Sequence, residues 1–348
     1  MPVFEHELTR LLEQHARAEG FDRVAVAAAG RLERDGAALV AWLGAGHHAG
    51  MEWMQRSPEA RADPGEILPG CKSVVSLALN YKPPADNATG EKAARVARYA
   101  QGRDYHKLLR KKLRRVAAWL EETSGAEART FVDTGPVLER AWAEQAGLGW
   151  IGKNANLITR ETGSWFLLGE ILTTAALVPA PGPHIDFCGS CTACIEACPT
   201  GAITDPGVVD SRRCISYWTI EHRGSVPEEQ RAGHGDWIFG CDVCQEVCPW
   251  NRRFSRPASR DPLQWREDLS RLEPEQLLAM DEATFRGLYS GTALMRAKWE
   301  GMRRNACIVL GNRKQRTALP ALRRALDDPD PVIREHAAWA IRVIEEFG

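Results

Sequence analysis

The stretch that decides the fold reads Cys188-x-x-Cys191-x-x-Cys194-x-x-x-Cys198-Pro199, then Cys214, then Cys241-x-x-Cys244-x-x-x-Cys248-Pro249. Three closely spaced thiolates can reach one four-iron, four-sulfur cluster, and the fourth cysteine, which precedes a proline, reaches the neighbouring cluster. We therefore expect two clusters. The expected ligands are Cys188, Cys191, Cys194 and Cys248 for the first cluster, and Cys198, Cys214, Cys241 and Cys244 for the second. Zinc and disulfides are the alternatives, but paired zinc sites do not need the proline-terminated runs.

The composition is that of a globular protein with room for two or three domains. The chain has 348 residues, is 44% hydrophobic and 26% charged, and carries a net charge of −1. Ligand cysteines fit a reducing cytosol, and residues 1–7 show no basic export signal. The most apolar stretch, residues 165–180, is interrupted by Glu170 and is too short to cross a bilayer. These features predict a cytoplasmic protein without membrane spans.

Hydrophobic patterning divides the chain into three parts. Residues 1–176 alternate helical and strand-like segments and predict a mixed α/β or α+β domain. Residues 177–256 hold the cysteines, and residues 257–348 are helical. Strands are expected at residues 24–26, 73–79, 130–132 and 164–174, and helices at residues 8–18, 105–122 and 136–146.

The last part resembles a HEAT repeat over residues 318–341. A single repeat cannot bury its apolar face alone, so it must pack on the helices before it. A plain helical cap on the core is the alternative interpretation.

The segment from Gly147 to Gly152 matches GxGxxG. A dinucleotide site needs a strand before this motif and a helix after it. Here a helix is expected before it, so these glycines more plausibly form a tight loop that approaches a flat ligand.

Asp133 stands where an expected strand meets an expected helix. It can be an ordinary N-cap carboxylate, or a general acid in a ligand pocket. The second role would need dry, apolar surroundings that raise its pKa. The sequence leaves both interpretations open.

Basic residues gather in two places. Ten lysines and arginines and one acidic residue lie between Lys92 and Arg115, and a second group contains Arg296, Lys298, Arg303 and Arg304. Such runs are often solvated helix faces, and the alternative is a surface that follows nucleic-acid phosphates.

Several strings together resemble the epoxyqueuosine reductase family, and the resemblance covers essentially the whole chain. They are Gly102-Arg-Asp-Tyr-His-Lys107, the segment from Asp133-Thr-Gly-Pro136 to Arg140, Gly149-Trp-Ile-Gly-Lys-Asn154, the segment 163–171, the cysteine array, and Arg303-Arg-Asn-Ala306. Some family members run longer than one HEAT unit at this end, which bears on the extent of RNA contact.

The resemblance implies a cobalamin enzyme that reduces epoxyqueuosine to queuosine at the wobble position of tRNA. It implies a cobalamin-binding first domain similar to reductive dehalogenases, and Asp133 as the proton donor. The cofactor would be base-off, because the sequence has no DxHxxG string. The residues implied around it are Arg61, Ala97, Asp133, Lys153, Asn154, Leu157, Ser164, Leu168 and Ser216.

The resemblance also implies partners: a tRNA with a GUN-type anticodon carrying epoxyqueuosine, and a low-potential electron donor protein. We expect a monomer. The residues implied in tRNA binding are Arg98, Arg103, Lys107, Arg140, Arg296, Lys298, Arg303, Arg304 and Asn305.

Three rival functions are a corrinoid reductive dehalogenase, a ferredoxin-type electron-transfer subunit, and an RNA-binding scaffold with structural clusters, which would bind RNA without taking up cobalamin. The first predicts a twin-arginine export signal, and the second needs neither a 176-residue first domain nor an acid at Asp133.

Overall fold

The structure is a computed structural model that describes residues 2–83, 92–183 and 185–347. An antiparallel sheet organises its first part, in the order β1-β2-β7-β4. All three pairings are antiparallel, so this domain is α+β rather than doubly wound. The strands are β1 (Arg23–Ala28), β2 (Ser73–Asn80), β7 (Phe166–Thr173) and β4 (Ala128–Phe131), and each overlaps a strand expected from the sequence.

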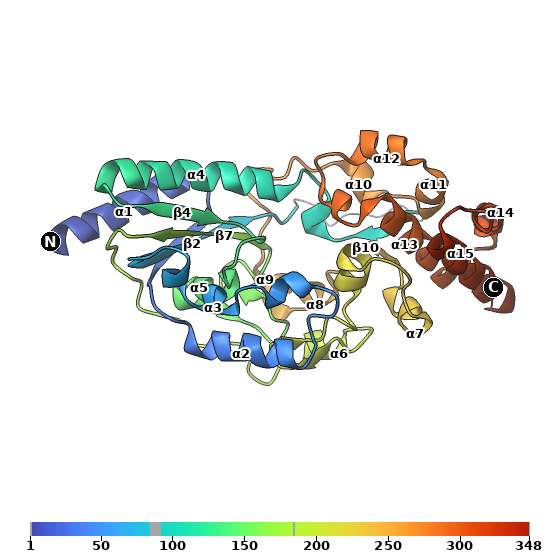
Figure 1. Cartoon of the computed structure of the whole chain (residues 1–348), viewed down its shortest axis with the longest axis horizontal. Helices are drawn as coiled ribbons and strands as arrows, with labels where there is room; N and C mark the ends of the chain where they lie inside the picture. The colour runs from blue at the N-terminus through green and yellow to red at the C-terminus, as the bar shows by residue number, and fades with distance from the viewer. Residues whose placement is uncertain (1, 84–91, 184, 348) are drawn as a thin grey trace.

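Helices cover both faces of this sheet, which explains why all eight residues of β2 are buried. Helices α1 (Pro2–Ala18) and α4 (Tyr105–Ser124) lie on one face (Figure 1). On the other face lie α5 (Glu139–Gln145), α2 (Glu33–Gly44) and α3 (Pro58–Ala62). Each face has its own apolar core, built around Leu113 and Ile171 on one side and Trp142 and Leu172 on the other.

Local signals fix both ends of α4, the helix that leads into the site. The Asp104 side chain accepts a hydrogen bond from the His106 backbone N–H at 3.0 Å and caps the N-terminus. Gly125, with φ +70°, ends the helix in a left-handed conformation. Its buried face consists of Leu109, Leu113, Val116, Ala117 and Leu120, the spacing of an amphipathic helix.

The glycine-rich segment forms a small hairpin between β5 (Trp150–Ile151) and β6 (Leu157–Ile158). A Cβ on Gly149 would lie 2.1 Å from the Ile158 carbonyl oxygen, so the two strands can approach only if this residue is glycine. Since a helix precedes the motif and a hairpin follows it, the structure agrees with the expected tight loop and not with a dinucleotide fold.

The cysteine-rich module is built from short elements. Helices α6 (Ala193–Glu196) and α8 (Val243–Glu246) each carry one cysteine and contact each other. Pro249 starts α9 (Pro249–Phe254), a position that suits its missing N–H. The remaining elements are the hairpin β8 (Ile203–Asp205) and β9 (Val208–Val209), the π-helical turn η4 (Tyr217–Glu221), α7 (Glu228–Arg231), and β10 (Trp237–Phe239), which pairs with β3 (Arg95–Val96).

The helical tail lies at the opposite end of the long axis from the N-terminus (Figure 1). Its last helices pack closely, since a Cβ on Gly311 would lie 2.6 Å from the Trp339 ring. The helices are α10 (Glu267–Ser270), α11 (Pro274–Ala279), α12 (Glu282–Tyr289), α13 (Lys298–Asn312), α14 (Leu319–Ala325) and α15 (Pro331–Phe347).

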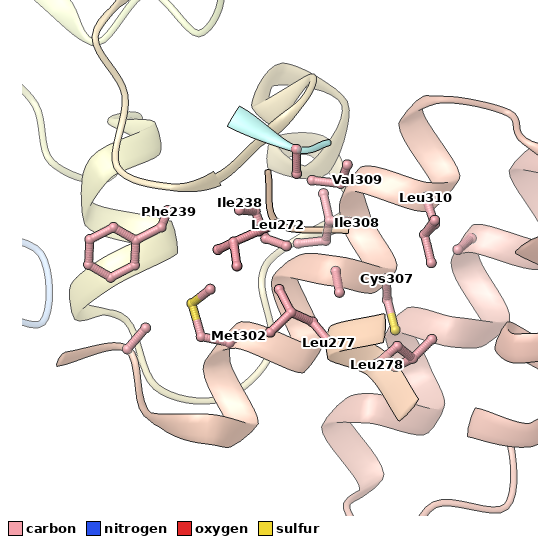
Figure 2. Close-up of a cluster of buried hydrophobic side chains, with 14 of the residues drawn as sticks. Ile238, Phe239, Leu272, Leu277, Leu278, Met302, Cys307, Ile308, Val309 and Leu310 are labelled. Atoms are coloured by element: carbon pink, nitrogen blue, oxygen red, sulfur yellow. The ribbon is translucent and has the colours of Figure 1, made fainter. Parts of the chain in front are cut away.

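The tail and the cysteine module share one apolar core (Figure 2). Ile238 and Phe239 of β10 belong to the same cluster as Met302 and Ile308 of α13. The core also includes Val96 from the first part of the chain. The boundary expected near residue 256 therefore falls within this shared core, whereas the sheet of the first part keeps its own apolar cores. Within the described residues, no helix combines the length and the apolar character that a bilayer crossing needs.

Candidate active site beside the cysteine module

A central cavity of about 420 Å³ lies between the first domain and the cysteine module. Asp133, Glu139 and Arg140 line it from the first domain. On the module side it is bordered by the four cysteines expected to bind the second cluster, Cys198, Cys214, Cys241 and Cys244. The cavity therefore joins a group of ionisable side chains to a cluster-binding set of thiols.

A second cavity of about 270 Å³ is bordered by the other four cysteines, Cys188, Cys191, Cys194 and Cys248. Cys191 is exposed, whereas Cys248 is buried. The structure thus groups the thiols as their spacing suggested, one set towards the surface and one set against the central cavity.

Aromatic side chains shelter the thiols of the first cluster. The indole N–H of Trp150 points at the Cys188 sulfur, with 3.5 Å between the nitrogen and the sulfur. Trp150, Phe187 and Trp250 pack edge to face with centroid distances of 5.2 to 6.1 Å. Hydrogen bonds to cluster sulfurs and the exclusion of water both tune a cluster's reduction potential.

Asp133 sits in the loop between β4 and α5 with a φ of +52°, which is unusual for a residue with a side chain. The N-cap of α5 is Leu138, without a side-chain hydrogen bond. The simple N-cap interpretation of Asp133 is therefore wrong. Instead the Glu139 carboxylate accepts the backbone N–H of Asp133, which fixes the loop at the mouth of the cavity.

The Asp133 carboxylate bonds to an imidazole from α4. The Asp133 Oδ2 atom lies 2.9 Å from His106 Nε2, and His106 Nδ1 lies 2.6 Å from Asp104 Oδ1. Burial alone would raise the pKa of Asp133, but the hydrogen bond and charge of His106 outweigh it and lower the pKa. The general-acid interpretation from the sequence required a raised pKa at Asp133, whereas the environment of this side chain lowers its pKa.

Glu139 has the opposite electrostatic environment. Burial, together with the neighbouring charge of Asp133, raises the pKa of Glu139 to about 8. Two carboxyl groups of one cavity therefore have their pKa values pushed apart, an arrangement that is common where acid and base roles are divided.

Most of the residues expected around the cofactor line the central cavity. They are Asp133, Asn154, Leu157, Ser164, Leu168 and Ser216. Lys153 borders the other cavity, and its Nζ donates to the Gly189 carbonyl oxygen at 2.7 Å. Arg61 and Ala97 are buried outside the cavity lining, and the Arg61 guanidinium bonds to the carbonyl oxygens of Gly135 and Trp53.

The lining fits a large flat ring with polar substituents. Leu157, Phe166, Leu168 and Ile215 provide apolar walls, and tyrosine, asparagine, serine and carboxyl side chains provide polar groups between them, a combination that suits a large cofactor with polar substituents. A corrinoid bound here would lie beside the second cluster's thiols.

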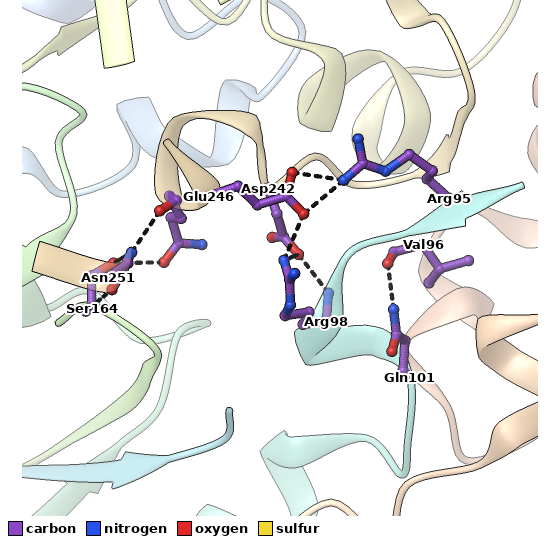
Figure 3. A network of polar contacts seen from close by, with 9 residues as sticks. Arg95, Val96, Arg98, Gln101, Ser164, Asp242, Glu246 and Asn251 are labelled. Carbon is purple, nitrogen blue, oxygen red and sulfur yellow. Dashed lines mark hydrogen bonds and ion pairs between the residues drawn. The ribbon is translucent and has the colours of Figure 1, made fainter. Parts of the chain in front are cut away.

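A polar network ties the segment around β3 to the cysteine module (Figure 3). The Arg98 guanidinium lies 3.5 Å from Asp242 and 2.7 Å from Glu246, and Arg95 pairs with Glu246 at 2.6 Å. On the other side of the network, Ser164 accepts a hydrogen bond from Asn251 at 2.8 Å. Arg98 was expected to contact tRNA, but the structure places it in this internal network beside cluster ligands.

Three further residues expected to contact tRNA lie inside the tail. Arg303, Arg304 and Asn305 are 7%, 2% and 0% exposed. Arg304 donates to the carbonyl oxygens of Trp218, His222 and Gly224. The expectation that these residues contact RNA therefore conflicts with their burial. The donors of Arg304 and Asn305 hold α13 against η4, and those of Arg303 bond to the Leu278 carbonyl oxygen and the Asp328 carboxylate.

The remaining basic residues lie where RNA could reach them. Arg103, Lys107, Arg140, Arg296 and Lys298 are exposed. Arg140 lines the central cavity, and Arg296 pairs with Glu221 at 2.6 Å. Of these side chains, Arg140 and Arg296 place positive charge near Asp133.

Sequence reasoning missed the roles of His106 and Glu139 in the site. Both occur in strings that support the family resemblance, but nothing in their local spacing shows that they meet Asp133. Tyr99 and Tyr105, which line the cavity, were missed for the same reason.

The fold and the site define an iron–sulfur redox enzyme with a cofactor-sized cavity, and comparisons with known proteins give its family. Residues 61–134 match the model described as "Epoxyqueuosine reductase QueG, DUF1730". Residues 187–251 match a 4Fe-4S double cluster binding domain, and residues 292–346 match HEAT repeats. The HEAT interpretation and the two-cluster interpretation are thereby confirmed.

Whole-chain relatives agree with these models. An epoxyqueuosine reductase of Vibrio cholerae is 42% identical over 341 residues, which cover 96% of this chain and 91% of the relative. An epoxyqueuosine reductase crystallised with an epoxyqueuosine-modified tRNA-Tyr stem loop is 32% identical, with a TM-score of 0.88 and coverage of 97% and 90%. The Bacillus subtilis enzyme, solved with its catalytic aspartate loop swung out of the active site, has a TM-score of 0.90 at 32% identity and the same coverage. This chain belongs to the epoxyqueuosine reductase family.

Proposed function

We propose that this chain reduces epoxyqueuosine to queuosine in tRNA, the reaction that names its family, and that the reaction takes place in the central cavity. One observation carries the proposal: Asp133 lies on one side of a cofactor-sized cavity, and four cysteines expected to bind a cluster lie on the other side. An acid and an electron source thus face the same space.

The reaction removes an epoxide oxygen, which consumes two electrons and two protons and releases one water. When bound, a cobalamin in the cavity and the two clusters beside it would supply the electrons one at a time. Electrons would enter at the first cluster, where Cys191 is exposed, and leave from the second cluster, which borders the cavity. The donor is then a low-potential carrier protein that docks near Cys191.

The protein's own residues handle the proton and the substrate. Asp133 would protonate the oxygen as its bond to carbon breaks, because an alkoxide is a poor leaving species. Asn154, Leu157, Ser164, Leu168 and Ser216 would hold the cofactor through the cavity wall, and Arg140 at the rim would contact the RNA.

The substrate would be the anticodon stem loop of a tRNA with a GUN-type anticodon, bound by a monomer in the cytoplasm. The modified base must leave its stack to enter the cavity. Exposed Arg103, Lys107, Arg296 and Lys298 would bind phosphates around the entrance. Arg98, Arg303, Arg304 and Asn305 are not included in this surface, because their side chains are used inside the protein.

The test is Asp133→Asn in anaerobically reconstituted protein loaded with cobalamin. Turnover on an epoxyqueuosine-containing stem loop should fall by about 10²-fold or more, while iron content, cobalamin content and RNA affinity stay unchanged. Asp327→Asn, at an exposed position of the tail, is the matched control and should behave like wild type. Unchanged turnover in Asp133→Asn would refute the proton-donor role, and failure of the wild-type chain to retain a corrinoid would favour a simple electron-transfer subunit.

A further inference from the structure

His106 bonds two carboxylates at once. Its Nδ1 atom is 2.6 Å from Asp104 Oδ1, and its Nε2 atom is 2.9 Å from Asp133 Oδ2. An ionised carboxylate only accepts hydrogen bonds, and a neutral imidazole has a single N–H to donate. A neutral imidazole between two ionised carboxylates can therefore form only one of these bonds. Both bonds form together only when Asp104, His106 and Asp133 share one additional proton.

Electrostatics place that extra proton on the imidazole. Burial would lower the pKa of His106, but its bonds to Asp104 and Asp133 outweigh this and raise the pKa to about 9. The same bond lowers the pKa of Asp133. At neutral pH Asp133 is therefore ionised at rest, and an ionised carboxylate has no proton to give to a substrate oxygen.

We propose that His106 holds the proton that Asp133 delivers, so that the two side chains act as one acid and Asp104 keeps the imidazole in place. The inference rests on the proposed function and deepens it. His106 acts through Asp133 and does not itself touch the substrate.

Two protons are needed to turn the epoxide oxygen into water, and His106 supplies the first of them through Asp133. As the first carbon–oxygen bond of the epoxide breaks, the Nε2 proton of His106 moves to the Asp133 carboxylate, and the carboxyl group formed in this way gives its proton to the electron pair left on oxygen. Asp133 ends ionised again, and the imidazole becomes neutral while its Nδ1–H stays bonded to Asp104. The external carrier protein supplies the two electrons through the clusters. A second proton, from solvent, completes the water as the remaining carbon–oxygen bond breaks, and a carbon–carbon double bond is left.

The arrangement of the loop supports this relay. The positive φ of Asp133 and the bond from its backbone N–H to Glu139 hold the carboxylate against α4. Arg110 of the same helix donates to Thr134 at 3.0 Å, which ties the next residue of the loop to α4 as well. The imidazole is also held by Tyr105, whose ring stacks on it with a centroid distance of 4.1 Å.

Other ionisable groups face the pair from several elements. Asp104, Tyr105 and Lys107 belong to the start of α4, Tyr99 to the preceding turn, Glu139 and Arg140 to α5, and Arg296 to the tail. Glu139, with its raised pKa, is largely uncharged at neutral pH and does not compete with Asp133 for the imidazolium. The cations Arg140 and Arg296 stabilise the ionised form of Asp133, which keeps the resting proton on His106.

The test uses His106→Gln and Asp104→Asn in the holoenzyme, with kcat measured against pH on saturating stem loop. Glutamine can still donate a hydrogen bond to Asp133, but it cannot carry a proton. For wild type we expect a plateau through neutral pH and a fall in kcat near pH 9. For His106→Gln we expect unchanged iron, cobalamin and RNA affinity, a roughly 10²-fold loss at pH 7.5, and activity that recovers towards acid pH. Asp104→Asn should keep the plateau of kcat, but its fall at alkaline pH should begin closer to pH 7.

An independent readout needs neither cofactor turnover nor substrate. In protein with ¹³C-labelled histidine, the resonance that is missing from His106→Gln should titrate near pH 9 in wild type and at lower pH in Asp133→Asn. Two results would overturn the proton-holding role of His106 and leave Asp133 as the acid. One is a wild-type pH profile of kcat in His106→Gln, and the other is an equal loss of kcat at every pH with RNA affinity intact. Full activity of Asp133→Asn would overturn the proton-donor role of Asp133 and the relay with it, whereas a wild-type holoenzyme that does not turn over the stem loop would overturn the proposed function itself.

Discussion

Replacing Arg304 separates an RNA-binding role from a structural one. Its guanidinium is buried and lies 2.6 Å from the Trp218 carbonyl oxygen, 3.1 Å from that of His222 and 2.9 Å from that of Gly224. Burial lowers the pKa of Arg304 to about 10, so the side chain is still charged at neutral pH. Methionine would keep much of the apolar stem while removing every donor.

The expected loss of stability follows from those three bonds. A hydrogen bond to a charged group contributes about 1.5–3 kcal/mol, so the low end of that range gives a loss of about 4 kcal/mol for Arg304→Met. We take the low end because burying the guanidinium has its own cost. With 348 residues and an unfolding entropy of about 2.1 cal/mol/K per residue, the melting temperature should fall by about 5–6 °C.

The assay is anaerobic urea unfolding and thermal melting of the holoprotein, together with stem-loop affinity at a temperature where the variant is folded. Arg323→Met is the matched control, because Arg323 is exposed and forms only a surface pair with Glu345 at 3.0 Å; it should lose less than about 1 kcal/mol. Affinity for the stem loop should be unchanged in both variants. A stability loss under about 1 kcal/mol in Arg304→Met, with RNA affinity at least tenfold weaker, would refute the structural assignment and restore the sequence-based one.

Three further predictions follow from single features. Gly149→Ala should destabilise the protein by about 2 kcal/mol or more in urea unfolding, since its Cβ would meet the Ile158 carbonyl oxygen at 2.1 Å; a loss below 0.5 kcal/mol would show that the hairpin relaxes easily. His234 is buried, and among the residues that the structure describes neither of its ring nitrogens has a hydrogen-bond partner. Burial, together with the charge of Arg304, lowers its pKa to about 3. Below pH 6.5 the unfolded chain therefore binds a proton that the folded chain does not, so acid destabilises the fold. Between pH 8 and pH 5.5 the free energy of unfolding of His234→Leu should rise by about 1.4 kcal/mol relative to that of wild type. A stability difference that does not change with pH would contradict the buried neutral state of His234. Lys107→Ala should lower the slope of log affinity for the stem loop against log salt by about 0.7–1, and an unchanged slope would remove Lys107 from the RNA surface.

The sequence determined the parts of this protein whose chemistry is local. Closely spaced cysteines can reach one cluster from a single loop, and the cysteine before each proline reaches the neighbouring cluster. This pattern predicted the two sets of thiols that the structure places at separate cavities. Helix α4 and strand β2 were predictable for a similar reason, because caps and apolar periodicity act within a few residues. Asp133 was found as a candidate because it follows a strand in a string typical of the family.

Only the tertiary structure decided which distant side chains meet. Residues 106 and 133 are joined because α4 packs beside β4, and no local pattern encodes the 2.9 Å contact between their side chains. The same packing reversed the expected electrostatics of Asp133, since a nearby imidazole outweighs burial. Sequence also cannot tell an arginine that faces solvent from one that faces unpaired carbonyl oxygens. Arg304 is charged in either case, and only the fold of α13 against η4 makes it an internal tie rather than an RNA contact.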